Sequence, residues 1–259
     1  MKNKIIIWLL KIFSFPIFYI LERNNENKIY LSYVWKNHLD YLIWIIRHNT
    51  KPEFNNFINC NFDFSANCLK SFEDLTFLFN SNYSNRGIVA LDFDEAGHIF
   101  KTIRTNNFGN LLEIGRFLGG STLLIGVAKS VDSRFVSVDL KVKAANYADD
   151  SVIEEVLSKS KIKNVDLVVD NSQNYKPDFN FDFVFIDGDH SYEGVKKDYL
   201  NISKYLNDGA HVLFHDAVAP RKFTTMHEEV NNYMKELSID SNLFHLKDVG
   251  SIRHFIFRK

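Results

Sequence analysis

The sequence predicts an α/β fold: a doubly wound, mostly parallel, Rossmann-like sheet of seven strands with helices on both faces. Apolar runs between residues 111 and 215 alternate with helical stretches, as parallel strands do when crossover helices join them. A glycine-rich turn follows the first of these runs. Two further runs meet near Gly250 and predict a C-terminal antiparallel hairpin at the sheet edge. An N-terminal helical extension is expected before the sheet.

The composition indicates an ordinary folded protein and excludes some classes of function. Of 259 residues, 46% are hydrophobic and 24% are charged, so the chain can bury a full core. A net charge of −1 leaves no basic surplus, so no nucleic acid is expected as a partner. Cys60 and Cys68 have no histidine beside them. We expect free thiols in a reducing compartment, which favours a cytoplasmic location.

The first segment, residues 1–27, contains the apolar run Ile5–Leu21, which Lys11 and Pro16 interrupt. A spanning helix needs about 20 apolar residues, and this run is shorter and charged near its middle. It also lacks the small-residue cleavage site of a signal peptide. Three alternatives stay open: a helix at the cytoplasmic membrane surface, a short signal-anchor, and a helix buried against the rest of the protein.

The second segment, residues 28–89, is expected to be a helical extension. Apolar residues at near-helical spacing predict a helix over Tyr30–His48, and Phe72–Phe79 is a second candidate. No catalytic pattern occurs in this segment. We expect its helices to pack on the following domain or to cover its site.

The third segment, residues 90–259, is expected to form the ligand-binding domain, with a helix over Asp92–Thr105 before the first strand. The predicted strands are Leu111–Ile114, Phe135–Asp139, Val165–Asp170, Phe181–Asp187, His211–His215, Leu243–Val249 and Ser251–Phe257. The predicted helices between them are Ser121–Val131, Ser151–Ser160, Tyr192–Leu206 and Thr224–Leu237. Ligands of such sheets bind at the carboxyl ends of the parallel strands.

A glycine-rich turn joins the first strand to the next helix, and its glycines would let a ligand approach the backbone. The residues of this turn expected to contact a ligand are Gly115, Arg116, Gly119, Gly120, Ser121 and Thr122. Ser121 or Thr122 can also cap the helix. A dinucleotide fingerprint needs a glycine at position 117, where this chain has phenylalanine. Because Phe117 would crowd a diphosphate, we expect a ligand without one.

Carboxylates at two strand ends indicate what that ligand is. Glu113, just before the turn, suits a cationic group and would repel phosphate. Asp139, at the end of the second strand, can accept hydrogen bonds from both hydroxyls of a ribose. A nucleoside with a positive end and no phosphates fits S-adenosylmethionine (SAM). Asp170 and Asn171 follow the third strand, where they either reach the adenine or only form a turn.

The fourth and fifth strands end in polar groups that would meet at one edge of a parallel sheet: Asp187, His190, His215 and Asp216. We predict that Asp187 and Asp216 bind Mg²⁺ or another divalent metal, because such ions prefer oxygen ligands. His190 is the predicted general base that takes the proton of an acceptor hydroxyl. His215 either binds the metal through nitrogen, which favours a transition metal, or contacts substrate.

These blocks together resemble class I SAM-dependent methyltransferases. The similar residues are Glu113–Gly115, Gly119–Thr122, Asp139 and Phe181–Asp198, and the resemblance covers about residues 90–259. The nearest branch methylates small-molecule hydroxyls with a divalent metal and includes macrolide-sugar and catechol-type O-methyltransferases. The resemblance implies that Asp187 lies at the cofactor and that Asp187 and the pair His215–Asp216 hold the metal. His215 departs from the carboxylate or amide of that branch.

The resemblance implies a SAM-dependent O-methyltransferase that acts on a hydroxyl of a small molecule or a glycan. Because SAM is a cytosolic metabolite, the domain should face the cytoplasm even if Ile5–Leu21 touches a membrane. A homo-oligomer is left open. The main alternative is a SAM-binding domain without catalysis, which acts as a partner or scaffold. An NAD-linked oxidoreductase is a weaker alternative, because Phe117 disfavours it.

Overall fold

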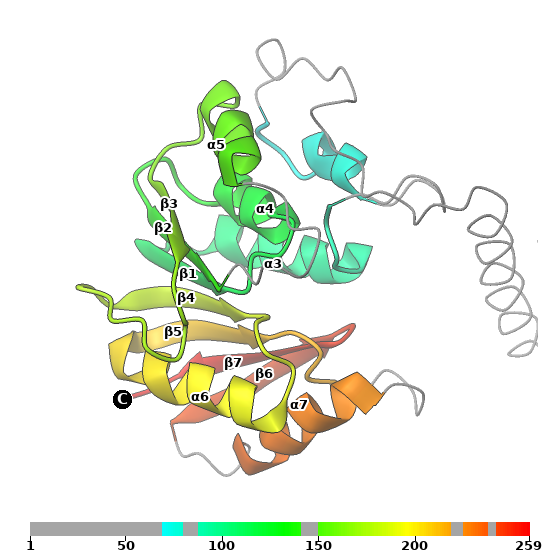
Figure 1. Cartoon of the computed structure of the whole chain (residues 1–259), viewed down its shortest axis with the longest axis vertical. Coiled ribbons are helices and arrows are strands. Elements are labelled where there is room, and N and C mark those ends of the chain that lie inside the picture. Colours follow the sequence, from blue (N-terminus) through cyan, green and yellow to red (C-terminus); the bar gives the residue numbers. More distant parts are fainter. Residues whose placement is uncertain (1–68, 80–87, 141–149, 219–224, 238–241) are drawn as a thin grey trace, which may run out of the picture. The chain divides into compact units, whose positions relative to one another are not determined.

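The computed structural model describes residues 69–79, 88–140, 150–218, 225–237 and 242–259 (Figure 1). The predictions for Ile5–Leu21, for Tyr30–His48 and for the two cysteines lie outside these residues. Within the described ranges no helix has the length and apolar character needed to cross a membrane.

One mixed sheet of seven strands organises the described residues, in the order β3-β2-β1-β4-β5-β7-β6. The strands are β1 Asn110–Ile114, β2 Arg134–Asp139, β3 Val165–Val169, β4 Phe181–Ile186, β5 Leu206–Phe214, β6 Leu243–Val249 and β7 Ile252–Phe257. Neighbours among β1 to β5 pair in parallel. Strand β7 is antiparallel to both β5 and β6. The predicted fold class, with its C-terminal hairpin, is confirmed.

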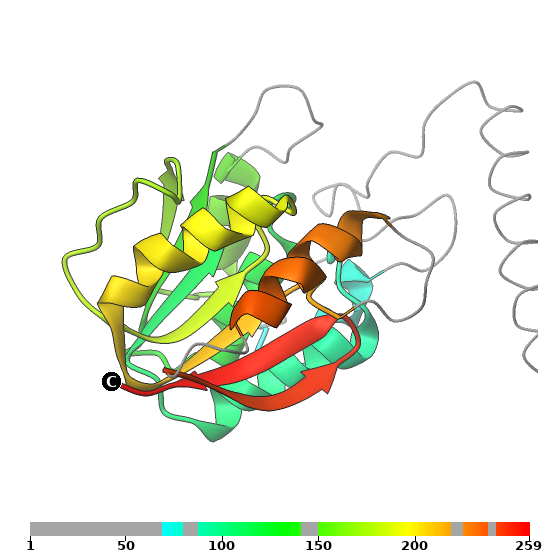
Figure 2. The same cartoon turned by 90° about the horizontal axis from the view of Figure 1, so that it is seen from below.

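Helices cover both faces of this sheet (Figures 1 and 2). They are α3 Phe93–Thr105, α4 Gly120–Ala128, α5 Asp150–Lys159, α6 Tyr192–Ile202 and α7 Thr225–Leu237, with short 3₁₀ helices at Glu73–Leu78 (η2) and Ser203–Tyr205 (η3). Helices α6 and α7 lie on one face, and α3 and α4 lie on the other. Alternate residues such as Leu112, Val184 and Val212 join the buried cluster under α6 and α7.

The strand order determines where the ligand-binding crevice of the sheet lies. From β1 the chain moves outward to β2 and β3, and it returns to the other side of β1 as β4. The order therefore reverses between β1 and β4, and ligands of open α/β sheets bind outside the carboxyl ends of the strands at such a point. The turns after β1, β2, β4 and β5 all lie at this edge.

The helix predicted over Tyr192–Leu206 is shorter than expected. The α-helical part ends at Ile202, a 3₁₀ turn follows, and Leu206 is already the first residue of β5. The apolar side chain of Leu206 continued the helical stripe in the sequence, but its backbone pairs with Phe181 of β4. A buried leucine suits either a helix or a strand, so the pairing with β4 decides that Leu206 belongs to the strand.

Candidate active site

A cavity of about 570 Å³ lies at the carboxyl ends of β1, β2, β4 and β5. Gly115, Phe117 and Asp139 line one part of it. Asp187, His190, His215 and Asp216 line another. The structure thus brings together the residues that the sequence placed at separate strand ends.

Gly115 allows the carboxyl ends of β1 and β4 to approach each other. Its φ is +90°, a conformation that suits glycine, and a Cβ at this position would lie 2.0 Å from the carbonyl oxygen of Asp187. Its N–H donates to the carbonyl of Val138 at 2.9 Å. The close packing of this turn against the backbone of Asp187 therefore requires a glycine at position 115. Gly115 also lines the cavity.

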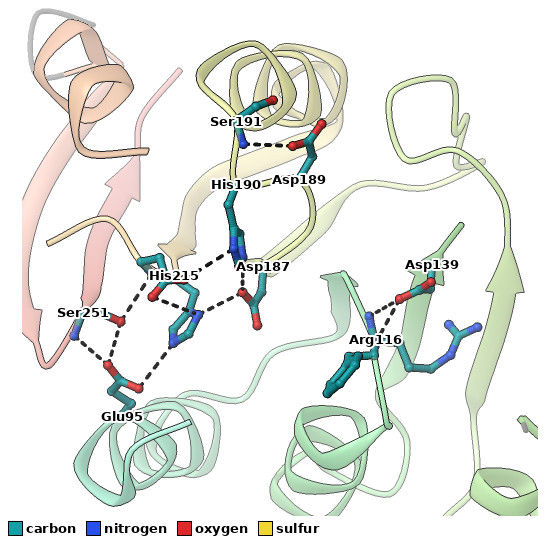
Figure 3. A network of polar contacts seen from close by, with 11 residues as sticks. Glu95, Arg116, Asp139, Asp187, Asp189, His190, Ser191, His215 and Ser251 are labelled. Carbon is teal, nitrogen blue, oxygen red and sulfur yellow. Dashed lines mark hydrogen bonds and ion pairs between the residues drawn. The ribbon is translucent and has the colours of Figure 1, made fainter. Parts of the chain in front are cut away.

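Asp139 holds the turn after β1 while it lines the cavity. Its Oδ2 accepts hydrogen bonds from the backbone N–H groups of Arg116, at 2.7 Å, and Phe117, at 3.0 Å (Figure 3). Phe117 has a φ of +46°, which is unusual for a bulky residue. Its ring lines the cavity at the place where a dinucleotide-binding turn would have its middle glycine.

Arg116 lies outside the cavity, although the sequence made it a candidate ligand contact. Its side chain is 2% exposed and forms an ion pair with Asp150 at 3.0 Å. It also donates to the carbonyl of Ser137 at 2.7 Å. These contacts tie the turn to β2 and to the start of α5, so the structure gives Arg116 a role in folding.

Glu113 lies beneath the turn and not in the cavity wall. Its Oε2 accepts hydrogen bonds from the hydroxyls of Thr122, at 2.6 Å, and Ser137, at 2.5 Å. Its Oε1 is buried, and no group of the described residues donates a hydrogen bond to it. Burial raises the pKa of Glu113 to about 6, although hydrogen bonds from Ser121, Ser137 and Thr122 oppose the shift. The structure shows no direct path from this carboxylate to a ligand in the cavity.

The start of α4 is built by Gly119 and Gly120, which do not line the cavity. Gly119 is the N-cap residue, with a φ of +82°. A Cβ on Gly120 would lie 2.3 Å from the carbonyl oxygen of Ile88. These glycines let α4 pack closely on its neighbours, and neither Ser121 nor Thr122 reaches the cavity wall.

The loop after β3 contributes Ser172 and Gln173 to the cavity wall. Asp170 and Asn171, the candidates in the same loop, do not line the cavity. Asn171 Oδ1 accepts a hydrogen bond from the N–H of Gln173 at 2.9 Å, which is the turn chemistry considered as the alternative. The sequence analysis did not single out Gln173.

Asp187 joins two histidines from different loops (Figure 3). Its Oδ1 lies 3.1 Å from Nε2 of His190 and 2.9 Å from Nδ1 of His215. Asp216 is 7% exposed and flanks both rings, with its oxygens 3.5 Å from Nδ1 of His190 and 3.7 Å from Nδ1 of His215. The predicted convergence of these residues is what the structure shows.

Charge coupling within this cluster is strong. Burial raises the pKa of Asp187, but the charge of His215 and hydrogen bonds from both histidines outweigh it and lower the pKa to about 2. The hydrogen bond to Asp187 raises the pKa of His190. Burial lowers the pKa of His215, but Asp187 and Glu95 together raise it well above its usual value. Without a cation in the cluster, these contacts therefore favour an ionised aspartate beside protonated histidines, and a bound cation would oppose that protonation.

Glu95 belongs to this site, and sequence reasoning missed it. It lies in the first turn of α3, is 3% exposed, and has Oε2 3.4 Å from Nε2 of His215. Asp92 and Glu95 also form a capping box at the start of α3. This local role would by itself account for a glutamate at this position. Its second contact is with a residue 120 positions away, which local patterns do not reveal.

The donor set fits a divalent metal. Among the described residues, one ligand atom each from Asp187, His190 and His215 lie within 4.8 Å of one another. Neighbouring ligands of an octahedral ion with bonds of about 2.1 Å lie about 3.0 Å apart. Between two of these atoms, Asp187 Oδ1 and His215 Nδ1, the distance of 2.9 Å matches that spacing. Imidazole nitrogens shift the preference from Mg²⁺ toward Mn²⁺ and later transition metals.

Comparison with known proteins adds a family assignment for part of the chain. Residues 112–217 match the profile of a family described as a methyltransferase domain. The matched range runs from β1 past the end of β5, and it includes Asp139, Asp187, His190, His215 and Asp216. No curated protein sequence matches the chain significantly.

Solved structures share the fold at low sequence identity. The methyltransferase PaMTH1 of Podospora anserina, with bound SAH, is 14% identical with a TM-score of 0.53, over 91% of this chain and 97% of that one. Cofactor-bound Rv0187 from MTB is 15% identical with a TM-score of 0.53, over 66% and 83%. An O-methyltransferase from Bacillus cereus with SAH is 17% identical with a TM-score of 0.48, over 65% and 84%. The similarities to PaMTH1 and Rv0187 show the fold.

Proposed function

We propose that this chain methylates a hydroxyl group with the help of a divalent metal. The premise is its similarity to the domain and fold of class I SAM-dependent methyltransferases. The acceptor we propose is a small molecule or a glycan. The observation that carries the proposal is the meeting of Asp187, His190, His215 and Asp216 in the same cavity as the turn after β1.

Two parts of one cavity suit the two reactants. The part at Gly115, Phe117 and Asp139 lies where nucleoside cofactors bind in open α/β sheets. Asp139 presents a carboxylate there that can accept ribose hydroxyls, although its Oδ2 also holds the turn. Bound SAM supplies a methyl group on a positively charged sulfur. The second part, at Asp187 and the histidines, is where an acceptor hydroxyl would be activated.

His190 is the proposed general base. Its side chain is 36% exposed, more than that of His215 or Asp216 at 10% each, so it has the best access to an acceptor in the cavity. Asp187 and Asp216 contact its two ring nitrogens at 3.1 and 3.5 Å and would stabilise the imidazolium after proton transfer. General-base catalysis of this kind contributes about 10²- to 10⁴-fold in rate.

Asp187, His215 and Asp216 would hold the metal. A divalent ion lowers the pKa of a hydroxyl that it binds and so favours the alkoxide at neutral pH. The three side chains come from two adjacent strand ends, so the pairing of β4 with β5 fixes their separation. Because the donors include an imidazole, we expect Mn²⁺ or another transition metal to serve better than Mg²⁺.

The test is methyl transfer by the purified full-length protein. The assay supplies SAM labelled in its methyl group, Mn²⁺ or Mg²⁺, and a panel of catechols, phenols, free sugars and glycans. We expect transfer to at least one hydroxyl acceptor and its loss in excess EDTA, with recovery when Mn²⁺ is added back. Transfer that is undiminished in EDTA would exclude metal assistance. SAM binding without transfer to any acceptor would favour a non-catalytic partner or scaffold.

A further inference from the structure

His215 lies between two carboxylates that come from different parts of the fold (Figure 3). On one side, Nδ1 lies 2.9 Å from Oδ1 of Asp187, at the end of β4. On the other, Nε2 lies 3.4 Å from Oε2 of Glu95, in α3. The first carboxylate faces the cavity of the proposed reaction, while the second has no place in the mechanism described so far.

The Glu95 carboxylate is held rigidly. Its Oε1 accepts hydrogen bonds from the N–H of Ser251 at 2.6 Å and from the Ser251 hydroxyl at 2.8 Å. Its Oε2 accepts another from the N–H of Asp92 at 2.8 Å. Charge-assisted hydrogen bonds of this kind are stronger than neutral ones. The carboxylate therefore stays ionised and oriented. Burial raises its pKa, but the hydrogen bonds with His215, Ser251 and Asp92 outweigh burial and lower the pKa to about 2.

The turn between β6 and β7 makes room for this arrangement. Gly250 has a φ of +58°, and a Cβ there would lie 2.5 Å from Oε1 of Glu95. Next to it, the Ser251 carbonyl accepts hydrogen bonds from the N–H groups of Ala217, at 2.9 Å, and Val218, at 3.0 Å. Ser251 thus contacts both Glu95 and the chain that follows His215, so the hairpin fixes the carboxylate and the imidazole relative to each other.

A neutral imidazole has one N–H and one lone pair, and its partners decide which nitrogen carries the proton. A carboxylate can only accept, so Asp187 favours a proton on Nδ1 and Glu95 favours one on Nε2. If a metal takes the place of the Nδ1 proton, Glu95 keeps the remaining proton on Nε2. In that tautomer the lone pair of Nδ1 points to the space shared with Asp187. Carboxylates that hold a histidine in this way are common around metal sites, and their loss weakens metal binding about 10- to 100-fold.

We propose that Glu95 is a positioning residue that keeps His215 in the Nε2–H tautomer and so makes Nδ1 a metal ligand beside Asp187. Glu95 itself does not reach the reacting atoms. The inference rests on the proposed metal-assisted function, and it gives the reason why His215 presents Nδ1 to the metal.

The experiment measures Mn²⁺ affinity by isothermal titration at pH 8, without SAM or acceptor, for the wild-type chain, Glu95→Gln and Asp94→Asn. Glutamine keeps the shape of glutamate but loses the charge and half of the accepting capacity. We expect Glu95→Gln to bind Mn²⁺ about 10-fold or more weakly. Asp94 is an exposed carboxylate one residue away in the same helical turn, and we expect its replacement to leave the affinity unchanged.

SAM affinity separates positioning from general damage. Glu95 lies outside the cavity at Gly115 and Asp139, so Glu95→Gln should bind SAM with the wild-type dissociation constant. Equal Mn²⁺ affinity in wild type and Glu95→Gln would overturn the role of Glu95 and leave the proposed function standing. A wild-type chain that binds SAM but no Mn²⁺ would overturn the metal-assisted function together with this inference.

A second variant covers the case in which Glu95→Gln does not fold. Ser251→Ala removes the hydroxyl that donates to Glu95 Oε1 at 2.8 Å but keeps the backbone contact. We expect a several-fold loss of Mn²⁺ affinity with unchanged SAM affinity. An unchanged Mn²⁺ affinity would then contradict the proposal.

Discussion

At the scale of single residues, the sequence predicted which polar residues meet at the site. It did not predict all of their contacts. Asp187, His190, His215 and Asp216 were expected from their places after β4 and β5, because parallel strands end at the same edge. Arg116 and Glu113 were expected to contact a ligand, but the structure places both beneath the turn. There Asp150 pairs with Arg116, and the hydroxyls of Thr122 and Ser137 donate to Oε2 of Glu113. A strand-end position therefore does not decide whether a side chain points into the cavity or below it.

His190→Ala tests the role of the proposed base. We expect the turnover rate to fall about 10²- to 10⁴-fold, because the acceptor hydroxyl loses its proton acceptor. SAM affinity and Mn²⁺ affinity should stay close to wild type, as measured by titration calorimetry. A variant that loses Mn²⁺ binding instead would make His190 a metal ligand, which its 3.1 Å contact with Asp187 also permits.

At the scale of elements, two features fix the site: the tight turn between β1 and α4 and the contacts between α3 and the β6–β7 hairpin. The turn was visible in the sequence because glycines gather there. The hairpin was predicted, but not that its turn reaches the first turn of α3 through Ser251 and Glu95. That contact depends on the position of β7 between β5 and β6, which is a property of the whole sheet.

Gly115→Ala tests the close approach of β1 and β4. The new Cβ would lie 2.0 Å from a backbone oxygen, and the φ of +90° is strained for alanine. We expect the free energy of unfolding to fall by at least about 2 kcal/mol, with weaker SAM binding. The matched control is Gly97→Ala in α3, where the Cβ would meet only Phe72 at 3.9 Å. This change should raise stability by about 0.5–1 kcal/mol in urea unfolding.

A row of three histidines connects α3, β7 and β5 away from the proposed site. Nε2 of His98 lies 3.0 Å from Nδ1 of His254, whose Nε2 lies 2.9 Å from Nδ1 of His211. Burial is the main cause that lowers the pKa of His98 to about 4 and that of His254 to about 3. It also lowers the pKa of His211.

This row predicts a loss of stability in acid. Because these pKa values lie below the ordinary value of 6.5, the unfolded chain binds more protons, and the free energy of unfolding falls as the pH drops below 6.5. At pH 5 the loss is at most about 2 kcal/mol for each of His98 and His254. Urea unfolding at pH 7.5 and 5.0 measures it.

His254→Gln should reduce that difference, because glutamine keeps a donor and an acceptor but does not titrate. The control is His245→Gln, an exposed histidine of the same hairpin, which should preserve the wild-type difference. If both variants lose the same stability as wild type between the two pH values, the buried row is not the cause.

At the scale of the whole molecule, the described residues form one sheet of seven strands, and the predicted boundary at residue 90 stays a prediction. The neighbouring 3₁₀ helix Glu73–Leu78 lies against α3 through the rings of Phe72, Phe93 and Phe100. The membrane-surface expectation concerns Ile5–Leu21, outside the described residues, so it is a proposal about the full chain.

Fractionation of cells tests that proposal. We expect the full-length chain to sediment with membranes and a truncation lacking residues 1–27 to stay in the supernatant, because the apolar run would supply the attachment. Leu9→Glu combined with Leu10→Glu is the matched control, since it keeps the length but removes apolar surface. If the full-length chain stays in the supernatant, the run does not bind membranes.

The sequence by itself determined the fold class and the polar residues that follow the strands, and it led to the prediction of SAM as the cofactor. The sequence shows these features because they are local. They are the periodicity of apolar residues, the placement of glycines and the polar residues after apolar runs. Only the tertiary structure decided that Arg116 and Glu113 support the turn, that Leu206 begins a strand, and that Glu95 and Ser251 complete the site around His215. Each of these depends on contacts between residues far apart in the sequence, and the packing of the sheet and its helices sets those contacts.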